Sequence, residues 1–519
     1  MNSHHSTSWL RHVGVLLTLG LLLCLTALWN GQPFLYPDTP TYLRGAEMGA
    51  TRLLGPAVLK PWLPAAPQAA NEQPASPPAA NEPAKRVKGL TSIEDKVVLA
   101  GRSVYYGVLV YAGYLAGKMW LTVALQALAV AYVLQLLMQR LWKLRTRVVV
   151  GTVVALSLLT PLGAYAGFLM PDVFAPLVIL CMGTLAFYWR ELPYKHRWAL
   201  SLLLLFGLSA HASHVVLAAS LLGLALLVRW LSSRWQGVPT TALLVVAFCI
   251  GGAVAAEWAF NKAVTMAVGA PPMRMPHPMA RLIDLGPGTA YLKQRCPDSN
   301  FAACAYVQNY PTRWDEFLFS TDPAKGAFAL ADVATKRRLS DEQLRFVMEV
   351  IRFDPAGVAA GIGKDVLKQL VDFRVDITRY DNRGLALFEG RVPVAVFTDM
   401  QNSRAAQESP LNAWLTMATY ALVLLSVLLL AWQASVGKKT GAAQQQRLFT
   451  DFSWFVVAGV VANGVICATL ASSLDRFQSR VIWLLPFLAL AALAQARAYR
   501  PIPLQVNGSA MPSAMSSVP

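Results

Sequence analysis

The sequence predicts an all-α, polytopic membrane protein with about ten transmembrane helices and a large, mostly helical domain on one side of the membrane. Of the 519 residues, 55% are hydrophobic and only 14% are charged, whereas about a quarter of an ordinary soluble protein is charged. The apolar residues lie in runs of the length that a helix needs to cross a bilayer core about 30 Å thick. These patterns exclude a soluble globular protein, a disordered chain and a small disulfide-rich domain.

Ten apolar runs are candidates for membrane-spanning helices. They cover residues 13–29, 117–138, 148–166, 173–189, 198–211, 213–230, 240–263, 411–432, 452–474 and 481–496. The first run resembles a signal peptide, but Trp29 stands where cleavage needs a small residue, so we expect the run to stay attached. Residues 198–230 could form one helix or two. Two helices match the bilayer thickness better.

The basic residues indicate the orientation of the chain. Lys and Arg number 45 against 28 Asp and Glu, which gives a net charge of +17. With the N-terminus inside, the cytoplasmic loops would hold Arg140, Lys143, Arg145, Arg147, Arg190, Lys195, Arg197, Arg229, Arg234, Lys438, Lys439, Arg447, Arg497 and Arg500. This positive-inside pattern predicts that both termini are cytoplasmic, and we expect a multi-pass protein of a bacterial-type inner (plasma) membrane. The basic residues form no single aromatic-studded stripe, so we expect no nucleic-acid partner.

The predicted topology divides the chain into four parts. An N-terminal module of about seven helices (1–263) would include an outer loop at 31–116, in which the Pro/Ala/Asn-rich stretch 64–83 is a flexible excursion. Residues 264–410 would form an extracytoplasmic helical domain, followed by three C-terminal spans (411–496) and a cytoplasmic tail (497–519). In that domain, Ser340 and Gln343 fit a capping box, and Asp354 followed by Pro355 predicts a new helix start.

The predicted topology divides the six cysteines into two groups. Cys24, Cys181, Cys249 and Cys467 fall within spans, where small apolar side chains pack well. Cys296 and Cys304 fall in the outer domain, where an oxidising compartment such as a periplasm would favour a disulfide between them. No Cys/His grouping has zinc-finger spacing, so a metal site stays unknown.

Two carboxylates lie at the predicted outer ends of the spans. Asp38 follows the first span by a few residues, in an aromatic and Pro-rich segment, and Asp172 lies in the turn between the third and fourth spans. Each could instead act as a helix N-cap, Asp172 for the fourth span and Asp38 for a short helix through Tyr42. Both carboxylates should face the same aqueous edge, which makes them candidate catalytic residues.

This arrangement resembles the GT-C superfamily of integral-membrane glycosyltransferases, which includes protein O-mannosyltransferases and aminoarabinose transferases. The resemblance is carried by the segment around Asp38, the turn at Pro171–Asp172, the basic outer residues and the large outer domain. The segment from Gly101 to Tyr106 also looks like the one those enzymes place beside the acceptor.

The resemblance implies transfer of a sugar from a polyprenyl-phosphate donor to a lipid or glycan acceptor on the outer face. Asp38 would accept the proton of the acceptor, and Asp172 would orient the acceptor, hold a divalent cation or position an arginine. Candidates for the donor phosphate are Arg102, Arg281, Arg476 and Arg480, because a guanidinium binds phosphate oxygens in pairs. Residues near the substrates would be Tyr36, Tyr42, Tyr105, His211 and His214.

Other functions are also open at this level. The chain could be a transporter or flippase of lipid-linked saccharides, an O-antigen-type polymerase or ligase, or a noncatalytic assembly protein of the cell envelope. Each arginine could snorkel towards membrane lipids, and the two histidines could have a simple interfacial role. The few ionisable residues within the spans lie towards their outer ends, which favours an enzyme over an ion-coupled transporter.

Overall fold

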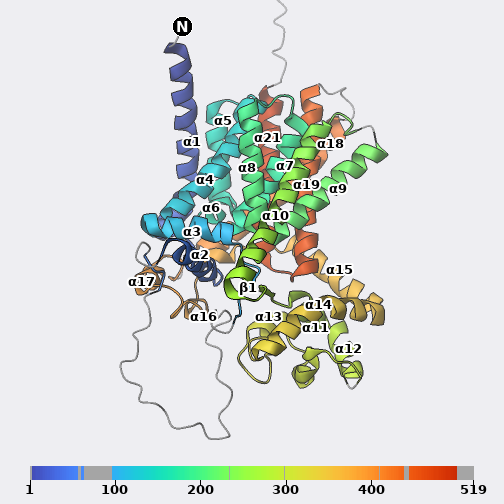
Figure 1. Ribbon diagram of the computed structural model, residues 1–519. Helices are drawn as coiled ribbons and strands as arrows, with labels where there is room; N and C mark the ends of the chain where they lie inside the picture. Colours follow the sequence, from blue (N-terminus) through green and yellow to red (C-terminus); the bar gives the residue numbers. More distant parts are fainter. Residues whose placement is uncertain are drawn as a thin grey trace, which may run out of the picture.

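The computed structural model describes residues 3–55, 60–63, 96–232, 234–296, 298–407, 410–437 and 444–498. The Pro/Ala/Asn-rich stretch, Lys438, Lys439 and most of the expected tail lie outside the described residues. Within them the chain is almost entirely helical, and the only strands are two short ones that pair with each other. Figure 1 shows a bundle of long helices with a smaller group of helices beneath it.

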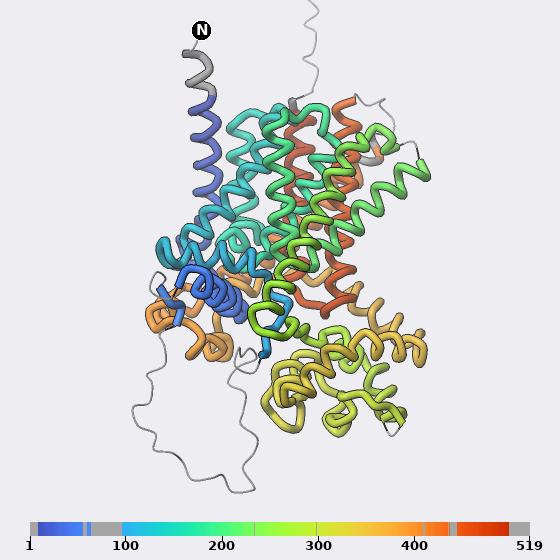
Figure 2. Tube along the Cα trace, viewed as in Figure 1, coloured from blue at the N-terminus to red at the C-terminus, as the bar shows by residue number. Residues whose placement is uncertain are grey.

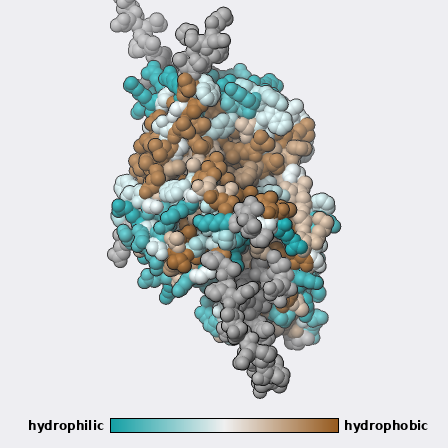
Figure 3. Space-filling model, turned by 60° about the vertical axis from the view of Figure 1, so that its left-hand side comes forward, coloured by the Kyte–Doolittle hydropathy of each residue, from teal (hydrophilic) through white to brown (hydrophobic). Residues whose placement is uncertain are grey.

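Among the described residues, eight helices are long and apolar enough to cross a membrane. They are formed by α1 (Ser3–Asn30), α4 (Trp120–Gln135) with η1 (Leu136–Leu141), η2 (Pro171–Val173) with α7 (Phe174–Tyr188), α9 (Ala212–Leu231), α10 (Thr240–Val268), α18 (Leu411–Gly437), α19 (Gln444–Leu470), and α20 (Asp475–Ile482) with α21 (Leu484–Ala498). Figure 3 shows a broad hydrophobic band across one face of this bundle, between more hydrophilic surfaces above and below. The protein is therefore a polytopic helical protein suited to a membrane.

Two further predicted spans correspond to shorter helices. The run 148–166 forms α5 (Thr146–Leu159) and a short α6 (Leu162–Ala166), and the run 198–211 forms α8 (Tyr194–Ala210). The uncertain stretch 198–230 is two helices, because His211 has an extended backbone between α8 and α9. Its Nδ1 accepts the N–H of Ser213 at 3.2 Å and so caps the start of α9.

The first predicted outer loop contains ordered helices. Helix α2 (Thr39–Leu54) packs against α3 (Val104–Gly117), which lies across the lower end of the bundle (Figure 1). Gly107 permits this contact, since a Cβ added there would lie 2.6 Å from the carbonyl oxygen of Tyr42. After α3 the chain turns at Lys118 and Met119, both with positive φ, and enters α4.

The helices beneath the bundle have their own hydrophobic core. This lower unit contains β2 (Met273–Arg274), α11 (His277–Leu285), α12 (Pro287–Arg295), η3 (Ala302–Asn309), α13 (Trp314–Phe319), α14 (Val333–Phe353) and α15 (Pro355–Val371). Its core includes Met279, Leu292 and Phe346. The parallel pair β1 (Leu99–Ala100) and β2 joins the unit to the first loop.

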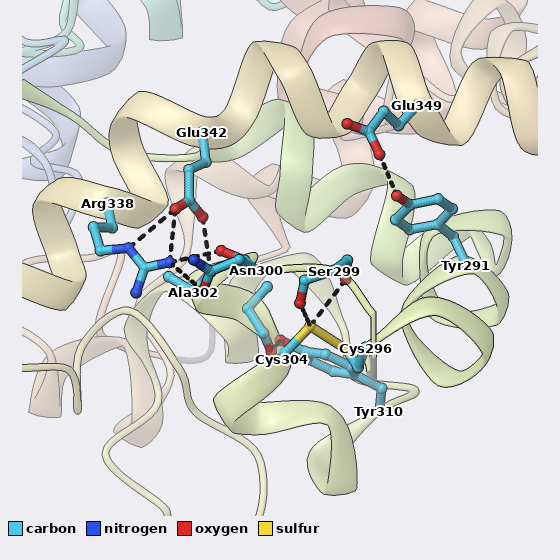
Figure 4. Close-up of a disulfide and its surroundings, with 11 residues drawn as sticks. Tyr291, Cys296, Ser299, Asn300, Ala302, Cys304, Tyr310, Arg338, Glu342 and Glu349 are labelled. Atoms are coloured by element: carbon cyan, nitrogen blue, oxygen red, sulfur yellow. Dashed lines mark hydrogen bonds and ion pairs between the residues drawn. A yellow bond between two sulfur atoms is a disulfide. The ribbon is translucent and has the colours of Figure 1, made fainter.

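Cys296 and Cys304 are joined by a disulfide in the lower unit. Figure 4 shows how this loop lies against α14. Glu342 accepts the N–H of Ala302 at 2.7 Å, and Arg338 donates to the carbonyl oxygen of Asn300 at 2.6 Å. These contacts fasten the disulfide loop to the longest helix of the unit.

Residues 264–410 do not share a single core. The segment after α15 contains η4 (Asp376–Thr378), α16 (Asn382–Ala386) and α17 (Val394–Gln401). Its Tyr380, Phe388 and Met400 belong to the core of the bundle and not to that of the lower unit. Residues 264–410 are therefore divided between two cores, and about the last quarter of them packs beside the first loop.

One helix start was predicted at the wrong place. Helix α14 begins at Val333, and the side chain of Asp332 caps it by accepting the N–H of Thr335 at 3.0 Å. Ser340 lies within this helix and accepts the N–H of Arg274 instead, so the expected capping box is absent. The helix start at Asp354 is confirmed, because its carboxylate accepts the N–H of Gly357 at 2.8 Å.

The contact between α2 and α3 generates a stability prediction. Replacing Gly107 with Ala should destabilise the protein by about 1–3 kcal/mol, because the new methyl group meets backbone atoms of α2 that cannot move independently. Thermal unfolding in detergent measures this. Gly49→Ala is the matched control, since a Cβ at Gly49 on α2 meets nothing within 4 Å. Equal unfolding temperatures for the two variants would contradict the packing assigned to Gly107.

Candidate functional site

The loop after α1 and the turn before α7 pair with each other and bring the two candidate aspartates to one region. The N–H of Phe34 donates to the carbonyl oxygen of Gly167 at 2.9 Å, and the N–H of Leu169 donates to the carbonyl oxygen of Phe34 at 2.9 Å. The hydroxyl of Thr39 then donates to the carbonyl oxygen of Leu169 at 3.0 Å. Because these bonds fix both backbones, the residues that follow, Asp38 and Asp172, are held at the same end of the bundle.

The segment after α15 fastens the same loop from the other side. The hydroxyl of Tyr380 accepts the N–H of Leu35 at 2.6 Å and also lies 3.2 Å from the carbonyl oxygen of Leu35. Arg391 donates to the carbonyl oxygen of Pro37 at 2.8 Å. Asp38 therefore stands on a backbone that is bonded on both flanks, as a catalytic group requires.

Asp38 forms an ion pair with Arg102. Its Oδ1 lies 2.7 Å from Nη2 of Arg102, and both side chains are about a quarter exposed (26% and 22%). Arg102 is held just before α3, where Ser103 caps the helix and donates to the carbonyl oxygen of Ser209 at 2.6 Å. Burial by itself would raise the pKa of Asp38, but the charges of Arg102 and Arg476 hold that pKa below its usual value. Asp38 is thus ionised at neutral pH.

Asp172 is deeply buried between two arginines of α20. Its Oδ1 lies 3.3 Å from Nη1 of Arg480 and 3.7 Å from Nε of Arg476. The carboxylate and Arg480 are only 3% and 2% exposed. Arg480 also donates to Oδ1 of Asn463 on α19 at 2.8 Å.

Arg476 lies between the two aspartates. Its guanidinium is centred 4.1 Å from the ring centroid of Tyr36, and its charge acts on Asp38 as well as on Asp172. We call Asp38, Arg102, Asp172, Arg476 and Arg480 the Arg–Asp cluster. It combines residues from the first loop, the turn before α7 and the start of the last span.

Several buried polar atoms around the Arg–Asp cluster have no hydrogen-bond partner among the described residues. They are Nε and Nη1 of Arg476, Nε of Arg480, the hydroxyl of Tyr42 and Nε2 of His214. A buried donor without an acceptor is costly, and the cost is larger for a charged group. Because the cluster holds three arginines and two aspartates, it also has an excess positive charge. Both features suit the binding of an anion.

Neither aspartate uses its side chain to cap a helix, although α2 does begin directly after Asp38. Asp38 therefore occupies the N-cap position of α2 without a side-chain cap bond, and Asp172 is not the N-cap of α7, whose N-cap is Val173. Among the described residues, no group of three or more His, Cys, Asp or Glu side chains is suited to hold a metal ion. The carboxylates instead face guanidinium groups.

Some predicted site residues lie apart from the Arg–Asp cluster. Arg281 pairs with Asp365 and lies 3.7 Å from Asp284, both in the lower unit, so the phosphate role predicted for it is not supported by its position. The hydroxyl of Tyr105 donates to the carbonyl oxygen of Ala256 on α10, which makes it a link between helices.

Other predicted residues do lie near the cluster. His211 and His214 have rings 5.4 Å apart, and Nδ1 of His214 bonds the carbonyl oxygen of Gly207 at 2.8 Å. This bond fixes the His214 ring and leaves its Nε2 as the unpartnered atom noted above. Tyr36 lies at the site because the guanidinium of Arg476 lies over its ring. Tyr42 has the buried, unpartnered hydroxyl.

Sequence reasoning missed His277 and Arg391. His277 follows β2 by three residues, and Arg102 follows β1 by two, so the carboxyl ends of this parallel pair bring them together. Burial, aided by Arg102 and opposed by Asp38, lowers the pKa of His277 to about 4, which keeps its imidazole neutral. No local pattern signals either residue, because both reach the site through contacts between distant segments.

Comparisons with protein-family models, with curated proteins and with solved structures find no match for this chain.

The burial of Asp172 leads to a prediction about stability. Asp172→Asn should destabilise the protein by about 3–5 kcal/mol, since it leaves two buried guanidinium groups without a counter-charge. Unfolding in detergent, followed by heat or denaturant, measures the loss. Asp451→Asn is the control, because its partner Arg234 is half exposed and such a pair contributes about 1 kcal/mol or less. A similar small loss in both variants would contradict the role given to Asp172.

Proposed function

We propose that this protein is a membrane glycosyltransferase that moves a sugar from a polyprenyl-phosphate carrier to an acceptor on the outer face of a bacterial-type inner membrane. The observation that carries the proposal is the set of unpartnered guanidinium donors of Arg476 and Arg480 beside the ionised Asp38. An anion site next to a carboxylate, at one end of an apolar bundle, suits a lipid phosphate donor and a hydroxyl acceptor. The assignment to the GT-C superfamily remains part of this proposal.

The phosphate would bind at Arg476 and Arg480. When the bond from the sugar C1 to the phosphate oxygen breaks, the phosphate leaves with the electron pair and gains negative charge. Guanidinium groups already fixed by Asp172 can stabilise this charge without reorganising. The lipid tail of the donor would stay in the bilayer beside the bundle. Asp172 acts here as a positioning residue.

Asp38 would act as the general base. As the acceptor oxygen bonds to the sugar C1, its proton passes to the carboxylate of Asp38. A donor phosphate near Arg102 would also compete with Asp38 for the guanidinium of Arg102, whose Nη2 lies 2.7 Å from Oδ1 of Asp38. Loss of that partner raises the pKa of Asp38 and makes it a better proton acceptor. Donor binding would then activate the base.

An assay of the purified protein in lipid tests the function. A panel of radiolabelled polyprenyl-phosphate sugars with envelope extracts should give label transfer to an acceptor. Elongation of a lipid-linked glycan would favour a polymerase or ligase that uses the same carriers. Movement of an intact lipid-linked saccharide across the bilayer without a new bond would favour a flippase. No activity of either kind from the folded protein would favour an assembly role and overturn the proposal.

Replacing the proposed base has a defined outcome. Asp38→Asn should lower kcat for transfer by about 10²–10⁴-fold, because the amide cannot accept the proton. The variant should still bind the donor, as Arg476 and Arg480 are unchanged. Asp399→Asn is the control, since this aspartate pairs with the exposed Lys118 away from the Arg–Asp cluster. An Asp38→Asn variant with full activity would eliminate Asp38 as the base.

The pH dependence provides an independent prediction. In the wild type the pKa of Asp38 lies below its usual value, so kcat/KM should not fall on this account as pH drops from 7 to about 5. In Arg102→Gln the main opposing charge is lost while burial remains, so the acidic limb of kcat/KM should move to higher pH. Arg44→Gln, at an exposed position on α2, is the control. An unshifted limb in Arg102→Gln would contradict the coupling of Arg102 to Asp38.

A further inference from the structure

A second basic site lies at the opposite end of the bundle from the Arg–Asp cluster. A pocket of about 750 Å³ is lined by the start of α1, by η1 and by the start of α5. Arg11, Arg145 and Arg147 contribute positive charge to it, and none of the described residues that line it is acidic. None of these arginines belongs to an ion pair between residues that the structure describes.

Glutamine side chains connect the elements that surround the pocket. Gln135 donates to the carbonyl oxygen of His12 at 3.0 Å and to the side chain of Gln139 at 3.0 Å. Gln139 in turn donates to the hydroxyl of Thr146 at 3.2 Å. This chain of bonds links α1, η1 and α5, so the three arginines are carried by elements that are fixed to one another.

The surroundings of the pocket are apolar. Val15 and Leu144 line it together with the basic residues. On α1, Leu10 lies directly before the lining residues and Leu17 and Leu21 lie after them, and all three are more than half exposed (60%, 56% and 61%). Figure 2 shows the coloured part of α1, in dark blue, at the edge of the bundle. A ligand with a charged head and long apolar chains matches this combination better than a free ion does.

We propose that this pocket binds the headgroup of an anionic phospholipid. The phosphate oxygens would accept hydrogen bonds from Arg145, Arg147 and Arg11, and the acyl chains would lie along the exposed leucines of α1. In the orientation that the positive-inside pattern predicts, this end of the bundle would face the cytoplasmic leaflet, where anionic lipids provide such headgroups. The lipid fills the space beside the first half of α1 and holds that helix against the bundle.

Binding of cardiolipin to the full-length protein in neutral detergent tests the proposal. Wild type should bind cardiolipin saturably and show a higher unfolding temperature, and phosphatidylcholine should do neither. The double variant Arg145→Ala/Arg147→Ala should bind cardiolipin about thirty-fold more weakly. Each lost charge costs about 1 kcal/mol of binding free energy, and about 1.4 kcal/mol corresponds to a tenfold change in affinity. Circular dichroism and gel filtration without lipid report whether that variant is folded.

The double variant Arg190→Ala/Lys195→Ala is the matched control. It removes two exposed charges from the same end of the bundle but outside the pocket, and it should bind cardiolipin as the wild type does. Equal losses in both double variants would mean a general surface attraction and overturn the proposal. It would also fail if wild type showed no preference for cardiolipin, or if inorganic phosphate stabilised the protein as much as the lipid does.

Discussion

The sharing of one buried carboxylate by two guanidinium groups is the constraint on which the arrangement of the candidate site depends. Asp172 faces Arg480 at 3.3 Å and Arg476 at 3.7 Å, and all three lie where water cannot replace a lost partner. Arg480 extends the contact to Asn463, so the starts of α7 and α20 are tied to α19. Asp172 supplies one negative charge for the two positive charges of Arg476 and Arg480, so a bound anion could balance the remaining positive charge.

The rest of the fold brings a second carboxylate to this site. The bonds between Phe34 and the residues before α7 place the first loop beside Asp172, and Tyr380 and Arg391 hold that loop from below. The pairing of β1 with β2 places both Arg102 and His277 near Asp38. Short contacts between segments distant in sequence therefore build the site, while the long helices provide the frame.

The sequence could predict the frame because apolar runs report helices directly. The ten expected spans all coincide with helices, and the break at His211 is present. Among the described residues, eight of these helices are long and apolar enough to cross a membrane. Asp38 and Asp172 were found because each lies next to the end of a span. Arg281 was assigned to the site by the same reasoning, but a helix of the lower unit turns it towards Asp365. His277 and Arg391 could not be found, because their positions depend on strand pairing and loop packing that have no local signature.

Equilibrium binding of a short-chain, water-soluble polyprenyl phosphate to the purified protein tests whether the Arg–Asp cluster is an anion site. We expect saturable binding to wild type, and binding at least about ten-fold weaker for Arg476→Gln, since a hydrogen bond from a charged group contributes about 1.5–3 kcal/mol. Arg404→Gln is the control, because Arg404 lies over Trp29 and not in the Arg–Asp cluster. No binding to the folded wild type, or equal binding by Arg476→Gln, would contradict the account.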